Sequence, residues 1–198
     1  MSIYRRFAEA YAKAGRGRFS LELVPWVTAV FARFGAAPAS LVDVACGAGE
    51  FAVAMARRGI AVTGVDQSPE MLALAAVAGA LRPGGVFVFD MNTLRGLAER
   101  SGNRTWVIQD TDDAFEADQS HFDYDTGIAT LRVNAFLHRR EGLYERIEEV
   151  HRERGYPVPA IDAALAATGF ERLGRWSSPA FDAVTPETAR VFYAARRA

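Results

Sequence analysis

The segment Leu41–Asp66 constrains the fold of this chain more than any other part of the sequence. An apolar run (Leu41–Val44) leads into a glycine-rich turn (Cys46–Gly49), a short helical stretch follows, and a second apolar run (Ile60–Val65) ends at Asp66. This order predicts a strand–turn–helix–strand unit, in which glycines let the backbone approach a ligand and the helix start offers free N–H groups. Asp66 is placed to accept the hydroxyl groups of a ribose. We therefore expect a pocket for a nucleotide-like ligand.

Two classes of ligand fit this unit, and they differ in charge. Gly47, Gly49 and Ala52 satisfy the G-x-G-x-x-G/A pattern of dinucleotide-binding proteins, with Asp66 at about the expected distance. Asp43 argues against a pyrophosphate, because a carboxylate so close to the turn repels phosphate and attracts an ammonium group. S-adenosylmethionine (SAM) carries an ammonium, a sulfonium and a ribose, and no phosphate. The sequence therefore favours SAM and leaves an NAD-binding protein as a distant alternative.

The glycine-rich turn is the first of several motifs that extend over nearly the whole chain. Residues Asp43–Gly49 read D-V-A-C-G-A-G, with Ala45 where a glycine would complete the pattern D-x-G-x-G-x-G. Further motifs follow at Gly64–Leu72, at Leu81–Asp90 and at Glu149–Tyr156. In this order they resemble the motifs of the class I SAM-dependent methyltransferases. The last of them is similar to a small-molecule subgroup that includes sugar-amine N-methyltransferases.

This resemblance implies a Rossmann-like α/β fold, SAM as the cofactor, and methyl transfer to a nitrogen or oxygen atom of a small molecule. It assigns the methionine end of the cofactor to Asp43, Ala45, Gly47 and Gly49, the ribose to Asp66, and the adenine to Gln67 and Met71.

The stretch after the second motif is much shorter than in that family. Residues Met71–Leu81 run directly into the turn Arg82–Gly85, where the family has its third and fourth strands. We therefore expect a shortened sheet with helices on both faces, in which strand 41–44 pairs directly with strand 86–90. Its unpaired edge favours a homodimer, formed through that edge or by strand exchange. The rival interpretation is a non-catalytic remnant of the methyltransferase fold that acts as a binding or dimerising module.

The remaining segments are expected to complete a single domain, 1–198. Residues 1–36 are predicted to form a helical lid over the cofactor. Alternating strand patterns separated by turn signals predict an inserted antiparallel sheet over 104–156. His151 is the leading candidate for a general base because histidine titrates near neutral pH, although a histidine flanked by charged residues also fits a structural role. Tyr124 is a candidate for hydrogen bonding to the acceptor.

Composition limits the partners and the location. The net charge of −1 gives no reason to expect nucleic acid or an anionic membrane as a partner. No apolar stretch approaches the length of a membrane span, and the N-terminus lacks the apolar core of a secretory signal. The single cysteine fits a reducing compartment, and the histidines lack the spacing of metal ligands. We therefore expect a cytoplasmic protein with no metal site and a small-molecule acceptor.

Overall fold

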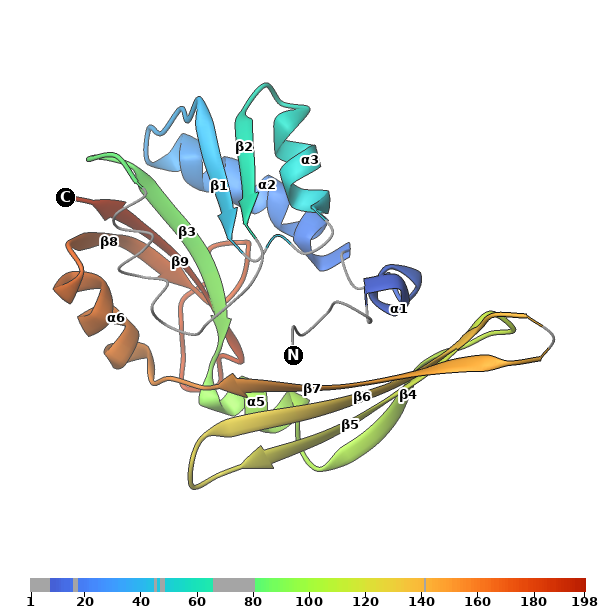
Figure 1. Cartoon of the computed structure of the whole chain (residues 1–198). Coiled ribbons are helices and arrows are strands. Elements are labelled where there is room, and N and C mark those ends of the chain that lie inside the picture. Colours follow the sequence, from blue (N-terminus) through green and yellow to red (C-terminus); the bar gives the residue numbers. More distant parts are fainter. Residues whose placement is uncertain (1–7, 16–17, 45, 47–48, 66–80, 141) are drawn as a thin grey trace. The chain divides into compact units, whose positions relative to one another are not determined.

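The chain divides into two compact units, which we describe separately. A computed structural model describes residues 8–15, 18–44, 46, 49–65, 81–140 and 142–198. One unit, here called the α/β unit, contains Arg18–Thr93 and Pro157–Ala198. The other, here called the antiparallel unit, contains helix α1 (Ala8–Lys13) and residues Leu94–Tyr156. Figure 1 labels the elements of both units.

The first part of the α/β unit is the predicted strand–turn–helix–strand unit. Strand β1 (Ser40–Val44) and strand β2 (Ala61–Val65) pair in parallel, and helix α3 (Glu50–Ala56) lies between them in the chain. Parallel pairing requires a crossover connection, which α3 supplies. The sequence prediction for this segment is confirmed.

The second part of the α/β unit is an antiparallel three-stranded sheet. Its order is β3 (Val86–Asn92), β9 (Arg190–Arg197), β8 (Phe170–Trp176). β8 and β9, the last two strands of the chain, pair antiparallel within this sheet.

The predicted direct pairing of strand 41–44 with strand 86–90 is wrong. Among the strands that the structure describes, β1 pairs only with β2, and β3 pairs only with β9. One hydrophobic core nevertheless serves both sheets, because a single cluster joins Leu41 and Val62 to Val86 and Val88. Trp176 and Phe192 pack beneath the β3–β9–β8 sheet, whereas Met55 of α3 packs on the side of β1 and β2.

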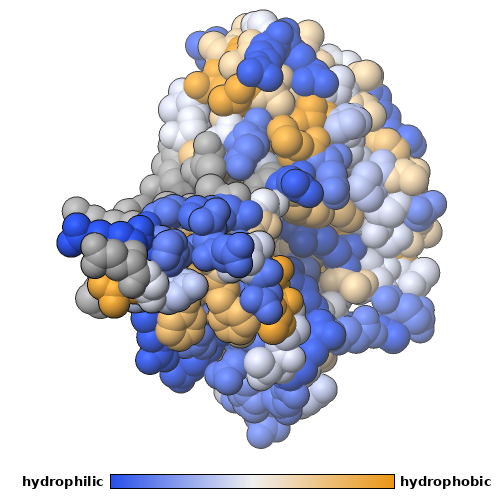
Figure 2. Space-filling view, turned by 90° about the vertical axis from the view of Figure 1, so that its right-hand side faces the viewer, coloured by the Kyte–Doolittle hydropathy of each residue, from blue (hydrophilic) through white to orange (hydrophobic). Residues whose placement is uncertain are grey.

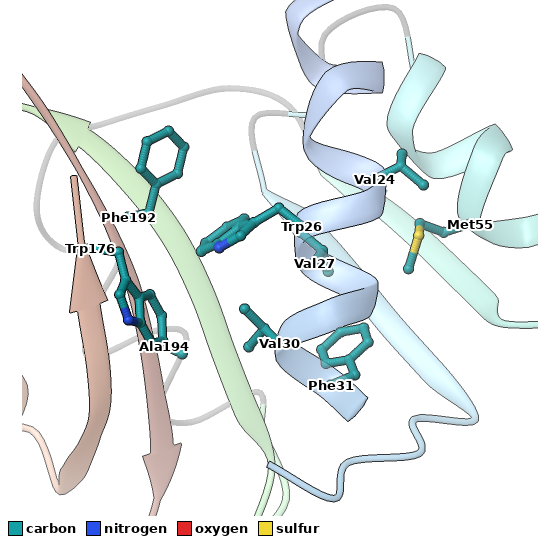
Figure 3. Close-up of a cluster of buried hydrophobic side chains, with 9 residues drawn as sticks. All are labelled: Val24, Trp26, Val27, Val30, Phe31, Met55, Trp176, Phe192 and Ala194. Atoms are coloured by element: carbon teal, nitrogen blue, oxygen red, sulfur yellow. The ribbon is translucent and has the colours of Figure 1, made fainter. Parts of the chain in front are cut away.

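Helix α2 (Arg18–Arg33) contributes to this core: it lies behind β1 and β2 in Figure 1, and its Trp26 packs against Trp176 and Phe192 of the other sheet. Its buried face carries Val24, Trp26, Val27, Val30 and Phe31, spaced as one stripe of an amphipathic helix. The indole of Trp26 packs edge-on against Phe192 at 5.1 Å between ring centroids, and Figure 3 shows Val24 beside Met55. Pro25 lies inside the helix without ending it.

The opposite face of the β3–β9–β8 sheet is covered by helix α6 (Val158–Ala167). Ile161 and Leu165 are its buried residues, and Asp162 forms ion pairs with Arg172 and Arg175 of β8. Helices therefore lie on both faces of a mixed α/β fold, as predicted. Pro159 lies in the first turn of α6, a position that suits proline.

The antiparallel unit is a four-stranded sheet in the order β4 (Arg104–Asp110), β5 (Ala114–Asp123), β6 (Ile128–His138), β7 (Tyr144–Arg154). All four strands belong to the inserted antiparallel sheet that was predicted over 104–156. Helix α5 (Leu94–Arg100) was not predicted; its Leu97 packs against Phe122 and Ala129.

Helix α1 lies on the same face of this sheet as α5. Its Ala10 is buried in a cluster with residues of β5, β6 and β7, and Glu9 pairs with Arg139 at 2.9 Å. The hydrogen bond from Arg139 lowers the pKa of Glu9. Figure 2 shows a face of the molecule on which hydrophilic residues predominate and hydrophobic residues form several separate groups.

Candidate functional site

The glycine turn joins β1 to α3 at the carboxyl end of β1. Gly49 has φ = 84°, in the left-handed region that favours glycine, and its N–H donates to the carbonyl of Cys46 at 2.9 Å. Gly49 is the N-cap of α3 and makes no side-chain capping bond. The turn is therefore tight, and it brings backbone N–H groups, rather than side chains, to the start of the helix.

Cys46 fixes this turn against the neighbouring strand. A Cβ atom at Gly64 of β2 would lie 2.9 Å from the Cys46 Sγ atom, closer than such atoms approach. Gly64 is also the register partner of Asp43. Cys46 therefore rests on the surface of β2.

Asp43 lies one residue before the end of β1 and is half-buried. Its Oδ2 atom is shielded from solvent. A carboxylate in this position gives the turn a negative field, which suits a cationic group and disfavours a phosphate.

Five of the predicted cofactor residues lie outside the described residues. They are Ala45, Gly47, Asp66, Gln67 and Met71. Asp43 and Gly49 are described, and the structure brings them to the two ends of the same turn.

The carboxyl end of β3 carries a second group of polar residues. Asp90 of β3 forms an ion pair with Arg190 of β9, which reaches Oδ2 through both Nε and Nη2. Asn92 is buried, and the Thr93 hydroxyl donates to the carbonyl of Thr188 at 2.8 Å. The end of β3 is thus joined to the start of β9 by side-chain contacts as well as by the backbone hydrogen bonds between the two strands.

His151 lies in β7, in the antiparallel unit. Its Nε2 atom is 3.4 Å from Oε2 of Glu149, and both side chains are largely buried. A carboxylate beside an imidazole fixes the orientation of the ring. Tyr124 follows β5, packs its ring edge-on against Phe122, and is 75% exposed. The structure thus gives His151 a defined partner, whereas Tyr124 lies on the surface of its unit.

Two carboxylates that sequence reasoning missed share the sheet face of His151. Glu116 and Asp118 of β5 are fully buried, and the Gln109 amide donates to Glu116 at 3.1 Å. Across the ladders, Asp118 aligns through Val133 with Glu149. Little in the sequence indicated this burial, because Glu116 and Asp118 alternate with the apolar Phe115 and Ala117, a pattern that places the two acids on the opposite face from those apolar residues.

Within the described residues, no group of three or more His, Cys, Asp or Glu side chains is arranged to hold a metal ion. Among the helices described, none has the length and apolar character needed to cross a membrane.

Comparison with known proteins identifies the fold. YqeM of Bacillus subtilis (strain 168) is 23% identical over 247 residues, which cover 98% of this chain and 97% of that protein. This alignment is longer than the chain, so YqeM has residues without a counterpart here.

Solved structures agree with this fold. A SAM-dependent methyltransferase from Clostridium acetobutylicum ATCC 824 aligns with a TM-score of 0.73 and 19% identity over 98% of both chains. The sugar N-methyltransferase KedS8 from Streptoalloteichus sp ATCC 53650 aligns with a TM-score of 0.65 and 20% identity, over 95% of this chain and 93% of KedS8.

The sequence model of the family described as methyltransferase domain matches residues 41–155, which is more than half of the chain. The match begins at β1 and includes the glycine turn. The match supports SAM as the cofactor and does not support the alternative of an NAD-binding protein. The chain therefore belongs to the methyltransferase domain family and has the class I, Rossmann-like fold of SAM-dependent methyltransferases.

Proposed function

We propose that the protein transfers a methyl group from SAM to a nitrogen or oxygen atom of a small molecule. The observation that carries this proposal is the turn between Asp43 and Gly49, which combines a half-buried carboxylate with a glycine in the left-handed conformation. A carboxylate beside an open backbone turn suits a ligand that has an ammonium group and no phosphate.

Each cofactor residue has a stated role in this proposal. Asp43 attracts the ammonium group of SAM, and the Ala45–Gly49 turn lies along the methionine end. Asp66 accepts the ribose hydroxyls, and Gln67 and Met71 contact the adenine. SAM, when bound, would supply the methyl group: a lone pair of the acceptor would form the new bond to the methyl carbon, and the electron pair of the broken methyl–sulfur bond would stay on sulfur, which gives S-adenosylhomocysteine.

The acceptor must lose one proton when it becomes a neutral methylated product. His151 is suited to take it, because Glu149 stabilises the imidazolium that results. The protein otherwise contributes alignment of the acceptor and exclusion of water. Tyr124 is proposed to donate a hydrogen bond to the acceptor.

A nitrogen acceptor is the more specific form of this proposal. Glu149 lies 3.4 Å from His151 and keeps part of its side chain exposed, and a carboxylate beside the proposed base suits a cationic amine. The neighbour KedS8 is a sugar N-methyltransferase, and a sugar amine is therefore the first acceptor class to test.

Partners and location complete the proposal. We propose a cytoplasmic protein in which residues 1–36 cover the cofactor and 104–156 form an insertion within one domain. β1 and β2, among the described strands, each pair on one side only, which favours a homodimer through an exposed edge or by strand exchange. The net charge of −1 gives no attraction for nucleic acid or an anionic membrane.

One observation favours a second candidate function. β1 and β3 belong to separate sheets, so the sheet lacks the continuity that usually underlies a cofactor pocket. A methyltransferase fold in this condition could act as a binding module without catalysis.

Calorimetric titration with S-adenosylhomocysteine, with NAD in a parallel cell, separates the two functions. Saturable micromolar binding of S-adenosylhomocysteine alone supports the methyltransferase, and Asp66→Ala should then weaken it while leaving the circular dichroism spectrum unchanged. Binding of neither ligand supports the non-catalytic module.

A further inference from the structure

Six arginines gather where the strands of the α/β unit begin. The residues before β1 and β2 lie side by side, because the N–H of Ala61 donates to the carbonyl of Ala39 at 3.0 Å. Helices α2 and α3 end there too, since short connections join them to β1 and β2. The start of β3 and the end of β9 reach the same edge, because Val86 aligns with Arg196, whose guanidinium donates to the carbonyl of Phe34 at 2.9 Å. We call it the arginine edge, and its arginines are Arg33, Arg57, Arg58, Arg82, Arg196 and Arg197.

The charges of the arginine edge are not neutralised by ion pairs. Within the described residues, none of its six arginines pairs with a carboxylate, and all but Arg196 and Arg197 are exposed. Arg58, Arg196 and Arg197 donate hydrogen bonds to backbone carbonyls instead. Elsewhere in the same unit an arginine does find an acid, as Arg190 pairs with Asp90. The edge therefore keeps guanidinium groups that can bind a negatively charged partner.

The net charge of the chain hides this local charge. The sequence of the α/β unit holds as many acidic residues as arginines, so acids elsewhere in the unit balance the edge. Glu171 is at the edge, opposite Arg196, and offsets part of the charge. Asp90, by contrast, lies four residues beyond the start of β3, about 13 Å along a strand, which exceeds the Debye length of about 8 Å at physiological salt. The arginine edge therefore keeps a positive field although the chain has a net charge of −1.

Helix dipoles account for only part of this arrangement. Arg33 and Arg57 lie at the carboxyl ends of α2 and α3, where a positive charge offsets the negative end of the helix dipole. Arg82 lies in the connection before β3, and Arg196 and Arg197 lie at the end of a strand. Strands have only small dipoles, so these three arginines have no such structural reason. They point to a partner outside the chain.

An aromatic ring lies beside the arginines. The Arg33 Cζ atom is 5.0 Å from the centroid of Phe181, within the range of a cation–π interaction. Phe181 has φ = 67°, which is uncommon for a residue other than glycine, and its ring packs edge-on against Trp176 at 4.9 Å between centroids. Arginine and aromatic side chains are both enriched at interfaces between proteins. Domains that bind nucleic acid are instead strongly basic overall, which this unit is not.

We propose that the arginine edge is a docking surface for an acidic segment of a partner protein. Carboxylates of that segment would accept hydrogen bonds from the exposed guanidinium groups, in pairs that can be bidentate. Backbone carbonyls already orient Arg58, Arg196 and Arg197, so docking removes less side-chain freedom than it would from mobile arginines. The glycine turn follows the opposite, carboxyl end of β1, so this inference goes beyond methyl transfer and does not depend on it.

The experiment measures the binding of fluorescein-labelled octaglutamate to the full chain by fluorescence anisotropy. The wild type should bind this peptide at low salt and lose affinity as the salt concentration rises, because salt screens attraction between exposed charges. The double variant Arg57→Gln/Arg58→Gln should bind about fivefold more weakly, since two exposed ion pairs are lost. Arg82→Gln, in a different connection of the same edge, should bind about twofold more weakly.

The matched control is the double variant Arg152→Gln/Arg154→Gln. These two arginines are exposed on β7, in the antiparallel unit, and neither pairs with a carboxylate within the described residues. The control removes the same charge and should bind octaglutamate as the wild type does. Equal losses in the two double variants would overturn the assignment to the arginine edge, and so would a wild type that does not bind the peptide. Circular dichroism checks that each variant folds.

Two other anionic probes test the class of partner. Single-stranded oligothymidylate and vesicles of phosphatidylserine are measured at the same salt concentration as octaglutamate. Tighter binding of either probe would overturn the choice of an acidic protein. The titration with S-adenosylhomocysteine keeps this inference separate from the proposed function. A wild type that binds octaglutamate but not S-adenosylhomocysteine would overturn the proposed function and support the docking surface.

Discussion

The sulfur atom of Cys46 lies against the backbone of Gly64, 2.9 Å from the place where a Cβ atom would be. This contact joins the glycine turn after β1 to the strand that ends before Asp66. The two segments that the sequence assigns to the two ends of the cofactor are thus in direct contact. Neither segment can move alone without opening or closing this contact.

Gly64→Ala should therefore disturb the cofactor turn more than it disturbs the fold. The new methyl group displaces Cys46, and the displaced turn loses its alignment with Asp43. We expect the affinity for S-adenosylhomocysteine to fall by about tenfold, because small displacements of binding groups are costly. Calorimetric titration measures the change, and circular dichroism checks that the fold remains.

Cys46→Ala is the compensating change. It removes the sulfur atom and leaves room for the new methyl group, so the double variant should bind better than Gly64→Ala alone. A double-mutant cycle measures this interaction. Additive losses in the two single variants would show that the contact does not couple the two segments.

Asp43→Asn should test the electrostatic part of the site. The amide keeps the shape of the side chain and removes the charge that attracts the ammonium group. We expect S-adenosylhomocysteine to bind about tenfold more weakly, since hydrogen bonds to charged groups contribute about 1.5–3 kcal/mol. The titration is repeated at high salt. Salt screens the attraction between Asp43 and the ammonium group, so the affinities of the wild type and the variant should then differ less.

The matched control for Asp43 is another acid in the same unit but away from the turn. Glu171→Gln changes an exposed residue of β8 and should leave the affinity unchanged. An Asp43→Asn variant with wild-type affinity would contradict the charge argument that separates SAM from NAD.

The parts of the fold that sequence predicted well are those with local signals. The turn at Gly49 and the strands of the antiparallel sheet were predicted because glycine, alternation and turn residues act over a few positions. β5 shows the limit of this reasoning. Its alternation was read as a strand, but the fully buried Glu116 and Asp118 were not recognised, because burial of an acid depends on what covers the strand.

Long-range relationships could not be predicted in the same way. The pairing expected between strands 41–44 and 86–90 assumed that the two strands become neighbours when the strands that usually lie between them are absent. β3 pairs instead with β9, a strand far along the chain, and no local pattern in the sequence specifies such a partner. The contact of Phe19 with the Arg190 guanidinium joins residues from opposite ends of the chain, and no spacing in the sequence points to it.

Asp162→Asn should destabilise the α/β unit, because Asp162 ties α6 to β8 through Arg172 and Arg175. The pair with Arg172 measures 2.5 Å, but both arginines are more than a third exposed, so solvent screens the interaction. We expect a loss of about 1 kcal/mol in the free energy of unfolding. Thermal unfolding followed by circular dichroism measures this loss. In a chain of this size, a loss of about 1 kcal/mol lowers the melting temperature by about 2–4 °C.

Glu148→Gln is the matched control for this prediction. Glu148 also pairs with two arginines, Arg132 and Arg146, but all three residues lie within the exposed surface of one sheet and join no helix to a strand. Its change should stay within about 0.5 kcal/mol. Equal losses in the two variants would contradict the role assigned to Asp162 in holding α6.

Tyr193→Phe should leave the α/β unit as stable as the wild type or make it more stable. The Tyr193 ring stacks on Phe89, with 4.9 Å between centroids and an interplanar angle of 3°, and phenylalanine keeps this contact. The hydroxyl is buried and no hydrogen bond of good geometry reaches it within the described residues, although the Arg175 guanidinium is close enough to offset part of the rise in its pKa that burial causes. Removing a polar group of this kind is neutral or stabilising, by up to about 1 kcal/mol.

The same variant should change the response to alkaline pH. Burial raises the pKa of Tyr193 in the folded protein, so above pH ~10 the unfolded chain releases this proton while the folded protein keeps it. Stability therefore falls as the pH rises through this range in the wild type, and Tyr193→Phe lacks this contribution. Urea unfolding at pH 8 and at pH 11 measures both proteins. The wild type should lose more stability between the two values than the variant does, and an equal loss would show that the Tyr193 hydroxyl is ionised as readily in the folded protein as in the unfolded chain.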